Sequence, residues 1–287
     1  MGRAGARAAR SRRMAMLGML VVLAGCQSGR GLGVAPLGLE RSSQRIPLVL
    51  PESEVQGAAA QAYQRTIQQA REAGLLETDP SVVTRVREVF RRLVSATAAW
   101  QTDVTAWPWE VQVVRAEDVD AWCLPGGRMI VHSGALTRAG LTDDELAALL
   151  SHEMAHVLRG HPRERMAQQV AQGASGAGTG TVMTRAAVGV AGPSAPPDLR
   201  PDAYLPTVQA PYSRAHEAEA DRIGVELAAR AGFDPRAARS MWGKVQGLPQ
   251  AGTSRWPGGH PGVSSRLDAL DTYAQRVMPL FEQAARP

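Results

Sequence analysis

The stretch T-D-D-E-L-A-A-L-L-S-H-E-M-A-H-V-L-R-G-H, residues 142–161, decides the fold of this chain. Thr142 followed three residues later by Glu145 predicts a capping box at the start of a helix. Asp143 and Asp144 add negative charge where the helix dipole favours it. Leucine, alanine, methionine and valine then form an apolar surface that is too wide for a solvated helix. The stretch therefore predicts a helix that is buried on most of its sides.

His152, Glu153 and His156 form an H-E-x-x-H motif inside this helix. Because the two histidines are four residues apart, both imidazoles project from one face and can bind the same metal ion. Glu153 is rotated by about 100° from His152 and can reach a metal-bound water without being a ligand. This pattern is typical of zinc peptidases. A chance arrangement is disfavoured, because unpaired histidine and glutamate side chains in a buried helix cost several kcal/mol.

A second acidic stretch, E-A-E-A-D, offers the third ligand that a catalytic zinc ion needs. Glu217 and Asp221 lie four residues apart on one face of a predicted helix. Glu217 can therefore bind zinc while Asp221 accepts the second N–H of a ligand histidine. Glu219 points away from this face and is expected to be solvated. His216 is an alternative ligand, although it would turn Glu217 off the metal, and His161 is expected to be structural.

The net charge of +5 does not indicate a nucleic-acid partner. Five arginines and no acidic residue lie within residues 1–25, and the rest of the chain has 27 basic and 27 acidic side chains. No basic patch is interleaved with aromatic residues. We therefore expect no nucleic-acid binding.

The first residues are typical of a secretory signal, with a basic stretch to Arg13, an apolar run over residues 14–24 and the sequence L-A-G-C ending at Cys26. This ending resembles the lipobox of bacterial lipoproteins, which implies lipidation of Cys26 after cleavage of residues 1–25. Gln27 follows, where inner-membrane retention signals have aspartate, and so the outer membrane is favoured. The alternative is an ordinary cleaved signal with an incidental cysteine. Cys123 then has no partner in the chain and is expected to be a small buried residue.

The Gly-, Pro- and Ser-rich residues 26–52 predict a flexible tether, and residues 53–287 a single domain. Apolar spacing predicts helices over residues 54–73 and 81–98. Alternating patterns then predict three short strands over residues 110–114, 119–124 and 128–132, with Pro125-Gly126-Gly127 as the turn between the last two. The last strand precedes the H-E-x-x-H helix and is expected to be an edge strand to which a peptide substrate pairs through Arg128, Met129, Ile130 and Val131. A purely structural hairpin is the alternative.

The second half of the chain alternates between helices and Gly/Pro-rich segments. A polar helical stretch follows Pro162 to Gln172, and residues 173–211 are expected to be a mobile insertion, which is a lid over the cleft or surface filler. Further helices are expected from Tyr212 until Gly232 stops the helix, from Pro235 through Val245, and over residues 264–284.

Four motifs in this order carry a resemblance: L-P-G-G-R-M-I-V-H-S-G, H-E-M-A-H-V-L-R-G-H, S-R-A-H-E-A-E-A-D-R-I-G and H-P-G-V-S-S-R-L. Together they resemble the gluzincin metallopeptidases, the group of the CAAX prenyl endopeptidases and the bacterial heat-shock membrane protease, in its periplasmic lipoprotein branch. The resemblance covers residues 82–270. It implies an α+β, mostly helical zincin-type domain with a small sheet, whose edge strand precedes the H-E-x-x-H helix.

The resemblance also assigns roles to single residues. It implies that Glu217 is the third zinc ligand beside His152 and His156, and that Asp221 is the acid that supports a ligand histidine. His260 matches the family histidine across the cleft and would donate a hydrogen bond to the developing oxyanion, with a structural loop histidine as the alternative. Arg266 would orient His260 or hold its helix onto the domain.

One departure concerns substrate binding. Asp120-Ala121 stands where the family usually has Asn-Ala, and a carboxylate there accepts hydrogen bonds but does not donate them.

The sequence thus predicts a zinc endopeptidase with one Zn²⁺ per chain, in which Glu153 acts as the base for a metal-activated water. Its expected partners are unfolded or misassembled envelope proteins and, through a lipid anchor, the membrane. Its expected location is the periplasm, at the inner leaflet of the outer membrane. The alternative function is a chaperone-like envelope lipoprotein with little proteolytic turnover.

Overall fold

The computed structural model describes residues 51–100, 103–176, 212–248 and 263–284. Several expected features lie outside these residues: the signal over 1–25, Cys26, nearly all of the tether over 26–52, most of the insertion over 173–211, and His260.

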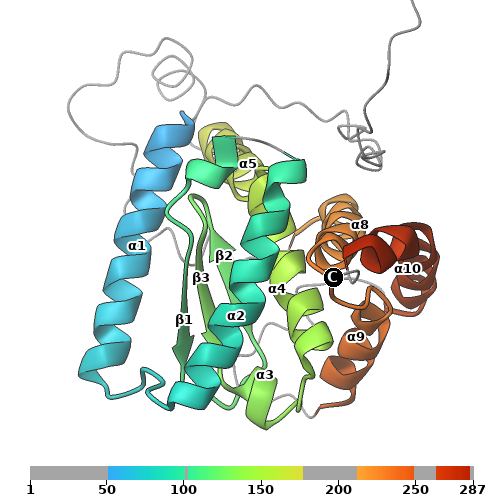
Figure 1. Ribbon diagram of the computed structural model, residues 1–287. Helices are drawn as coiled ribbons and strands as arrows, with labels where there is room; N and C mark the ends of the chain where they lie inside the picture. The colour runs from blue at the N-terminus through green and yellow to red at the C-terminus, as the bar shows by residue number, and fades with distance from the viewer. Residues whose placement is uncertain (1–50, 101–102, 177–211, 249–262, 285–287) are drawn as a thin grey trace, which may run out of the picture. The chain divides into compact units, whose positions relative to one another are not determined.

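Helices make up most of the described part of the chain (Figure 1). The helices are α1 (Glu52–Glu72), α2 (Pro80–Ala96), α3 (Gly134–Thr137), α4 (Asp143–Leu158), α5 (His161–Gly176), α8 (Arg214–Arg230), α9 (Ala237–Gly247) and α10 (Val263–Ala284). Short 3₁₀ turns, η1 (Thr97–Ala99) and η2 (Asp103–Ala106), follow α2. The helices that the apolar spacing predicts are all present, and α5 continues past the expected Gln172. Among the described helices, none is both long and apolar enough to cross a bilayer.

The sheet consists of β1 (Glu110–Val114), β2 (Ala121–Leu124) and β3 (Arg128–His132) in the order β1-β3-β2. β1 runs parallel to β3, whereas β2 and β3 form an antiparallel pair. Gly126 and Gly127 make the turn between them, at φ angles of 88° and 84° that glycine adopts readily. The fold is thus of the α+β class with a small sheet, as expected from the sequence.

The expected position of the third strand is wrong. β3 lies between β1 and β2, so its hydrogen-bonding groups are used on both sides by neighbouring strands. The side chains of Met129, Ile130 and Val131 are fully buried, and with Arg128 they form the centre of the sheet, not a peptide-binding edge. β1 pairs with β3 on the side opposite to β2, although β1 comes before β2 in the sequence. The alternation of apolar residues predicts the strands but not this order. The strand that borders α4 is β2.

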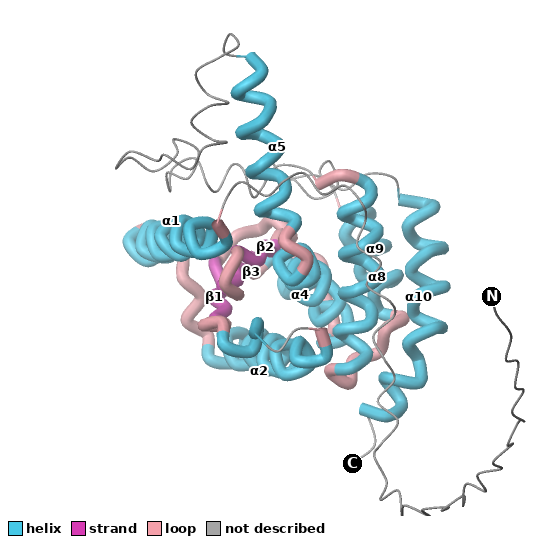
Figure 2. Tube along the Cα trace, turned by 90° about the horizontal axis from the view of Figure 1, so that it is seen from above, coloured by secondary structure: helices cyan, strands magenta, loops and turns pink. Residues whose placement is uncertain are grey.

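The two faces of the sheet bury different helices. Met129 and Val131 of β3 face a large core shared with α2, α4, α8, α9 and α10, whereas Ile130 between them packs with α1. Figure 2 shows α1 and α2 on either side of the strands, with α8, α9 and α10 grouped beyond α4. The period of two along the strand therefore divides the core into two clusters.

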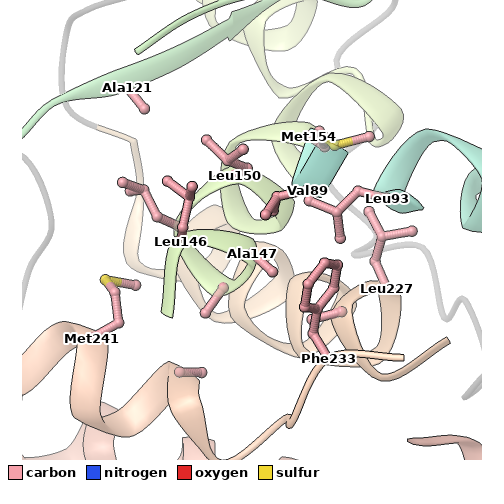
Figure 3. Packing of buried hydrophobic residues seen from close by; sticks show 14 of the residues in the cluster. Val89, Leu93, Ala121, Leu146, Ala147, Leu150, Met154, Leu227, Phe233 and Met241 are labelled. Atoms are coloured by element: carbon pink, nitrogen blue, oxygen red, sulfur yellow. The ribbon is translucent and has the colours of Figure 1, made fainter. Parts of the chain in front are cut away.

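α4 is the helix around which the larger core is built (Figure 3). It packs against β2, α2, α8 and α9, and Leu146, Leu149, Leu150 and Met154 are fully buried. The predicted capping box is present: the Thr142 side chain accepts from Glu145 N, and Glu145 Oε2 accepts from Thr142 N at 2.9 Å. Burial on all sides fixes α4 in position, and with it the motif that it carries.

Candidate metal centre

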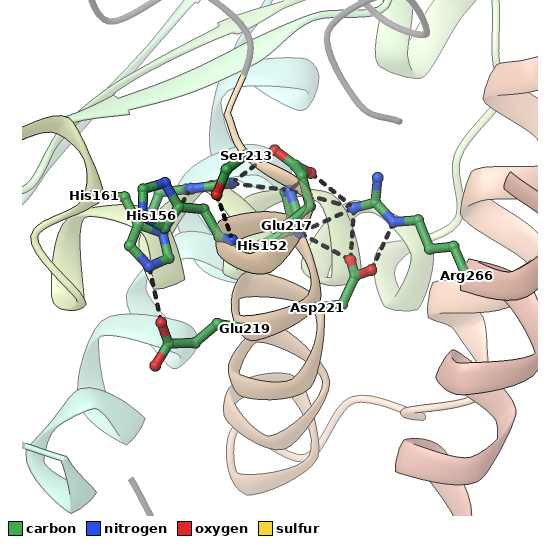
Figure 4. A network of polar contacts seen from close by, with 9 residues as sticks. His152, His156, His161, Ser213, Glu217, Glu219, Asp221 and Arg266 are labelled. Atoms are coloured by element: carbon green, nitrogen blue, oxygen red, sulfur yellow. Dashed lines mark hydrogen bonds and ion pairs between the residues drawn. The ribbon is translucent and has the colours of Figure 1, made fainter. Parts of the chain in front are cut away.

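His152 and His156 of α4 and Glu217 of α8 converge on one point (Figure 4). The Nε2 atoms of the two histidines lie 3.2 Å apart. The Glu217 carboxylate lies 3.4 Å from His152 Nε2 and 3.6 Å from His156 Nε2. Each of the three residues is at most 3% exposed. The structure thus brings together the three ligands that the sequence predicts.

These distances fit a single tetrahedral cation. Atoms bound to zinc at about 2.0–2.1 Å in tetrahedral geometry are separated by about 3.3 Å, close to the three separations observed. Two imidazoles and one carboxylate are also a donor set that catalytic zinc sites use, in which a fourth position is left for water or substrate. The residues present therefore fit a divalent metal ion.

A glycine allows the two ligand-bearing helices to approach this closely. A Cβ on Gly224 of α8 would lie 2.9 Å from the backbone nitrogen of His152 and 3.0 Å from its Cα. α8 starts one turn before Glu217, where the Ser213 hydroxyl caps the helix by accepting from His216 N. The start of α8 and the small residue at its crossing with α4 together place Glu217 opposite the histidines.

Asp221 lies beside the ring of His152, the position that the sequence predicts for it. Its Oδ1 lies 3.1 Å from His152 Nδ1, on the side of the ring away from the other ligands. Arg266 of α10 donates to both oxygens of Asp221 at 2.6 Å, and its guanidinium stacks on Trp242 with 3.6 Å to the ring centroid. Arg266 therefore connects α10 to α8 and α9, which fits the second of the two roles expected for it, that of holding its helix onto the domain.

The carboxylates of Asp221 and Glu217 stabilise the protonated form of His152. Burial alone would lower the pKa of this imidazole, but hydrogen bonds to Asp221 and Glu217 and their negative charges outweigh it and raise the pKa to about 9. For Asp221, burial acts to raise the pKa, and the contacts with His152 and Arg266 more than compensate and lower it. In the metal-free protein His152 is therefore protonated at neutral pH, and a metal ion must displace that proton.

Glu153 lies beside the ligands and is only 6% exposed. Burial raises its pKa to about 8, with further contributions from the charges of Glu217 and Asp120 and opposing ones from His152 and Arg266. A cation at the neighbouring ligands would lower this value by stabilising the carboxylate. Cys123 is a free buried thiol whose pKa is raised well above its usual value by burial and by Glu153, so it stays protonated. This confirms it as a small buried residue.

The prediction for Glu219 is wrong. Glu219 is 9% exposed, and its Oε2 lies 3.0 Å from Nε2 of His161, while its Oε1 accepts from Arg159 at 2.7 Å. His161 is 1% exposed, and its Nδ1 lies 3.0 Å from Nδ1 of the ligand His156. Helical spacing correctly puts Glu219 on another face of α8, but that face packs against the start of α5 and is not in solvent.

His216 is not part of the ligand group. Its Nε2 lies 3.1 Å from Glu164 Oε2 of α5, and its ring stacks on His161 at 4.2 Å between centroids. The structure therefore favours Glu217 over His216 as the ligand from α8.

Two residues at the site have no signal in the sequence. The ring of Tyr212 stacks on His156 with 3.8 Å between centroids and an interplanar angle of 16°. The Arg165 guanidinium lies 3.3 Å from the Tyr212 ring centroid. Burial raises the pKa of the Tyr212 phenol, so this side chain is neutral, and it covers one face of a ligand histidine. Neither residue belongs to a motif with metal-ligand spacing, and only the packing of α5 beside α8 brings them here.

Comparison with known proteins places this centre in a family. Residues 80–274 match peptidase family M48, and this range includes every ligand described above. The chain is 28% identical over 225 residues to the beta-barrel assembly-enhancing protease of Escherichia coli K12, which covers 76% of this chain and 44% of that protein. It is 25% identical over 254 residues to metalloprotease LoiP of the same organism, over 88% of this chain and 92% of that one.

A third relative is the mitochondrial metalloendopeptidase OMA1 of Bos taurus, which is 30% identical over 190 residues, 62% of this chain and 35% of the relative. All three relatives carry names of proteases, and two of the three are more than twice as long as the segment they share with this chain. The match over residues 80–274 and the geometry of the ligands agree, and the chain belongs to peptidase family M48.

Proposed function

We propose that this chain is a zinc-dependent endopeptidase. The observation that carries the proposal is the convergence of His152, His156 and Glu217 within 4.8 Å, with the buried carboxylate of Glu153 close enough to interact electrostatically with His152 and Glu217. The match to a metallopeptidase family supports a hydrolytic metal centre, and the imidazole and carboxylate donor set favours zinc as the metal.

A bound zinc ion supplies a Lewis acid that polarises a carbonyl and makes water more acidic. Glu153 then takes a proton from the water that attacks the peptide carbonyl and passes it to the amine nitrogen that leaves. A buried carboxylate suits this exchange, because burial brings its pKa toward neutral pH. Asp221 and Arg266 keep the His152 ring oriented throughout. Donation to the oxyanion by His260 remains part of the proposal.

β2 is the strand that we propose to pair with substrate, in place of β3. Among the described strands it pairs with β3 alone, and it packs against the metal-bearing helix α4. Asp120 O accepts from His132 N, so antiparallel alternation turns the backbone groups of Ala121 and Cys123 away from β3. Pairing through backbone groups accepts many side chains, as a protease for unfolded chains requires.

We further propose that the substrates are misfolded or unassembled envelope proteins and that Cys26 anchors the enzyme in the periplasm. The L-A-G-C sequence supports the anchor, and the name of the relative that enhances beta-barrel assembly supports the substrate class.

Replacement of the native protein by the Glu153→Gln form in the cell tests this proposal. Zinc binding should persist, cleavage should stop, and quantitative mass spectrometry should find uncleaved outer-membrane and periplasmic proteins enriched with the variant. An unchanged envelope proteome, together with purified wild-type protein that binds zinc but does not cleave casein, would instead support the chaperone-like alternative.

A further inference from the structure

The two ligand histidines are supported differently on the side away from the metal. His152 Nδ1 contacts a carboxylate directly, that of Asp221 at 3.1 Å. His156 Nδ1 contacts a second imidazole, that of His161 at 3.0 Å, whose other nitrogen lies 3.0 Å from Glu219. Both arrangements end at a carboxylate of α8, but the second one has an additional histidine in between (Figure 4).

The protonation of the ring nitrogens allows only one direction of hydrogen-bond donation along these contacts, from His156 to His161 and from His161 to Glu219. His156 Nε2 faces His152 Nε2 and Glu217, so Nε2 is the atom that binds metal and Nδ1 carries the proton. His156 Nδ1 must therefore donate to His161 Nδ1, which accepts only when the His161 proton is on Nε2. That proton is then donated to Oε2 of Glu219. Every donor has an acceptor in this arrangement, and a reversed tautomer of His161 would place two N–H groups against each other.

We propose that His161, held in this tautomer by Glu219, is a positioning residue for the metal ligand His156. Glu219 is fixed in turn, because Arg159 Nε and Nη2 both lie 2.7 Å from its Oε1. His161 also stacks on His216, so its ring plane is set by packing and its proton by hydrogen bonding. The three carboxylates of E-A-E-A-D thus serve one centre: Glu217 as ligand, Asp221 behind His152, and Glu219 behind His156 through His161.

The proposal rests on the metal function proposed above, and zinc affinity is its direct measure. His161→Asn keeps an acceptor oxygen near the position of Nδ1, whereas His161→Leu has a similar branched shape and no acceptor. Both variants lose the ring and its stacking. We expect the leucine variant to bind zinc about 10–100-fold more weakly in competition with a chelating indicator, and the asparagine variant to lose at most about threefold.

A second pair of variants makes one chemical change at two sites of the cluster. Glu219→Gln removes the charge next to His161, and Glu164→Gln removes the charge next to His216, whose imidazole stacks on His161 but does not belong to the ligand group. Zinc affinity should fall for Glu219→Gln and stay unchanged for Glu164→Gln. If the His161→Leu protein does not fold, the zinc affinities of the two glutamine variants are sufficient to test the proposal.

The proposal is overturned if wild-type protein binds zinc while the leucine and asparagine variants, or the two glutamine variants, have equal affinities. A loss of thermal stability in the metal-free protein without a loss of affinity would likewise assign His161 to packing alone. Wild-type protein that binds no zinc contradicts the proposed function itself, and Asp221→Asn serves as the positive control for a lost supporting acid.

Discussion

Gly224 of α8 lies against the backbone of His152 on α4, so close that a Cβ at this position would be 2.9 Å from the His152 nitrogen. Three residues of α8 thus lie against the part of α4 that carries the motif: Glu217 is the candidate ligand, Asp221 contacts the ring of His152, and Gly224 lets the helices meet. A side chain at position 224 would push α8 away from α4, and Glu217 away from His152 and His156.

Gly224→Ala is therefore expected to weaken zinc binding and to destabilise the fold by about 1–3 kcal/mol, because the added methyl group meets backbone that cannot rotate away. Chelator competition and urea unfolding measure the two effects. Gly243→Ala in α9 is the matched control: nothing lies within 4 Å of its Cβ, and a small gain of up to about 1 kcal/mol is expected from helix propensity. Equal behaviour of the two variants would contradict the close crossing of α4 and α8.

Asp221→Asn is expected to lower zinc affinity about 10–100-fold, because an amide neither orients His152 by charge nor satisfies Arg266. Asp268→Asn, an exposed carboxylate on α10, should leave affinity unchanged. Isothermal titration with zinc compares the two. Unaltered affinity in the Asp221 variant would show that the His152 contact has no part in metal binding.

Zinc affinity should depend on pH through His152. The pKa of this imidazole is about 9 in the metal-free protein, above its usual value, because Asp221 and Glu217 stabilise the protonated form. Below that pH zinc must displace a proton, so the dissociation constant should rise by about tenfold for each unit that the pH falls, as for one displaced proton. Affinity measured between about pH 6 and 9 tests this. Asp221→Asn lowers the pKa of His152 and should flatten the dependence at the upper end, whereas a pH-independent wild type would contradict the assignment.

Arg92 of α2 fastens the end of α8. Its guanidinium donates to the carbonyl oxygens of Ala231 and Gly232 at 2.8 Å and lies 3.8 Å from the ring centroid of Phe233. Arg92→Ala should destabilise the protein by about 1–3 kcal/mol, since carbonyl groups at the helix end lose charged donors. Chemical denaturation should show no such loss for Arg91→Ala, because the Arg91 side chain is exposed and pairs with the exposed Glu88 one turn earlier in the same helix. Equal losses would mean that the α2–α8 contact does not contribute.

Local patterns in the sequence predict the metal ligands because helix geometry fixes them. A spacing of four residues puts His152 beside His156 and Glu217 beside Asp221 in any regular helix, and the capping box fixes where α4 begins. That the two pairs meet follows from the three protein ligands that a catalytic zinc ion requires, since the H-E-x-x-H helix supplies only two. Gly224 lies where α8 crosses α4, and Gly232 lies just after the end of α8.

The predictions that the structure contradicts concern which helix and strand surfaces pack against each other. Glu219 is on the face of α8 where helical spacing puts it, but the sequence does not reveal that His161 and Arg159 pack there. The central position of β3 depends on its direct parallel pairing with β1, although β2 comes between these two strands in the sequence. Tyr212 and Arg165 reach the site only because α5 lies beside the start of α8. Each error concerns a long-range contact and not a local conformation.

In the proposed mechanism, His152, His156 and Glu217 hold zinc while Glu153 transfers the proton. Zinc content and casein cleavage measured together on wild type, Glu217→Ala and Glu153→Gln test it most directly. We expect about one zinc ion per chain and cleavage for the wild type, loss of both for Glu217→Ala, and retained zinc without cleavage for Glu153→Gln. Cleavage by the Glu153→Gln protein at the wild-type rate, or full zinc content in the Glu217→Ala protein, would contradict it.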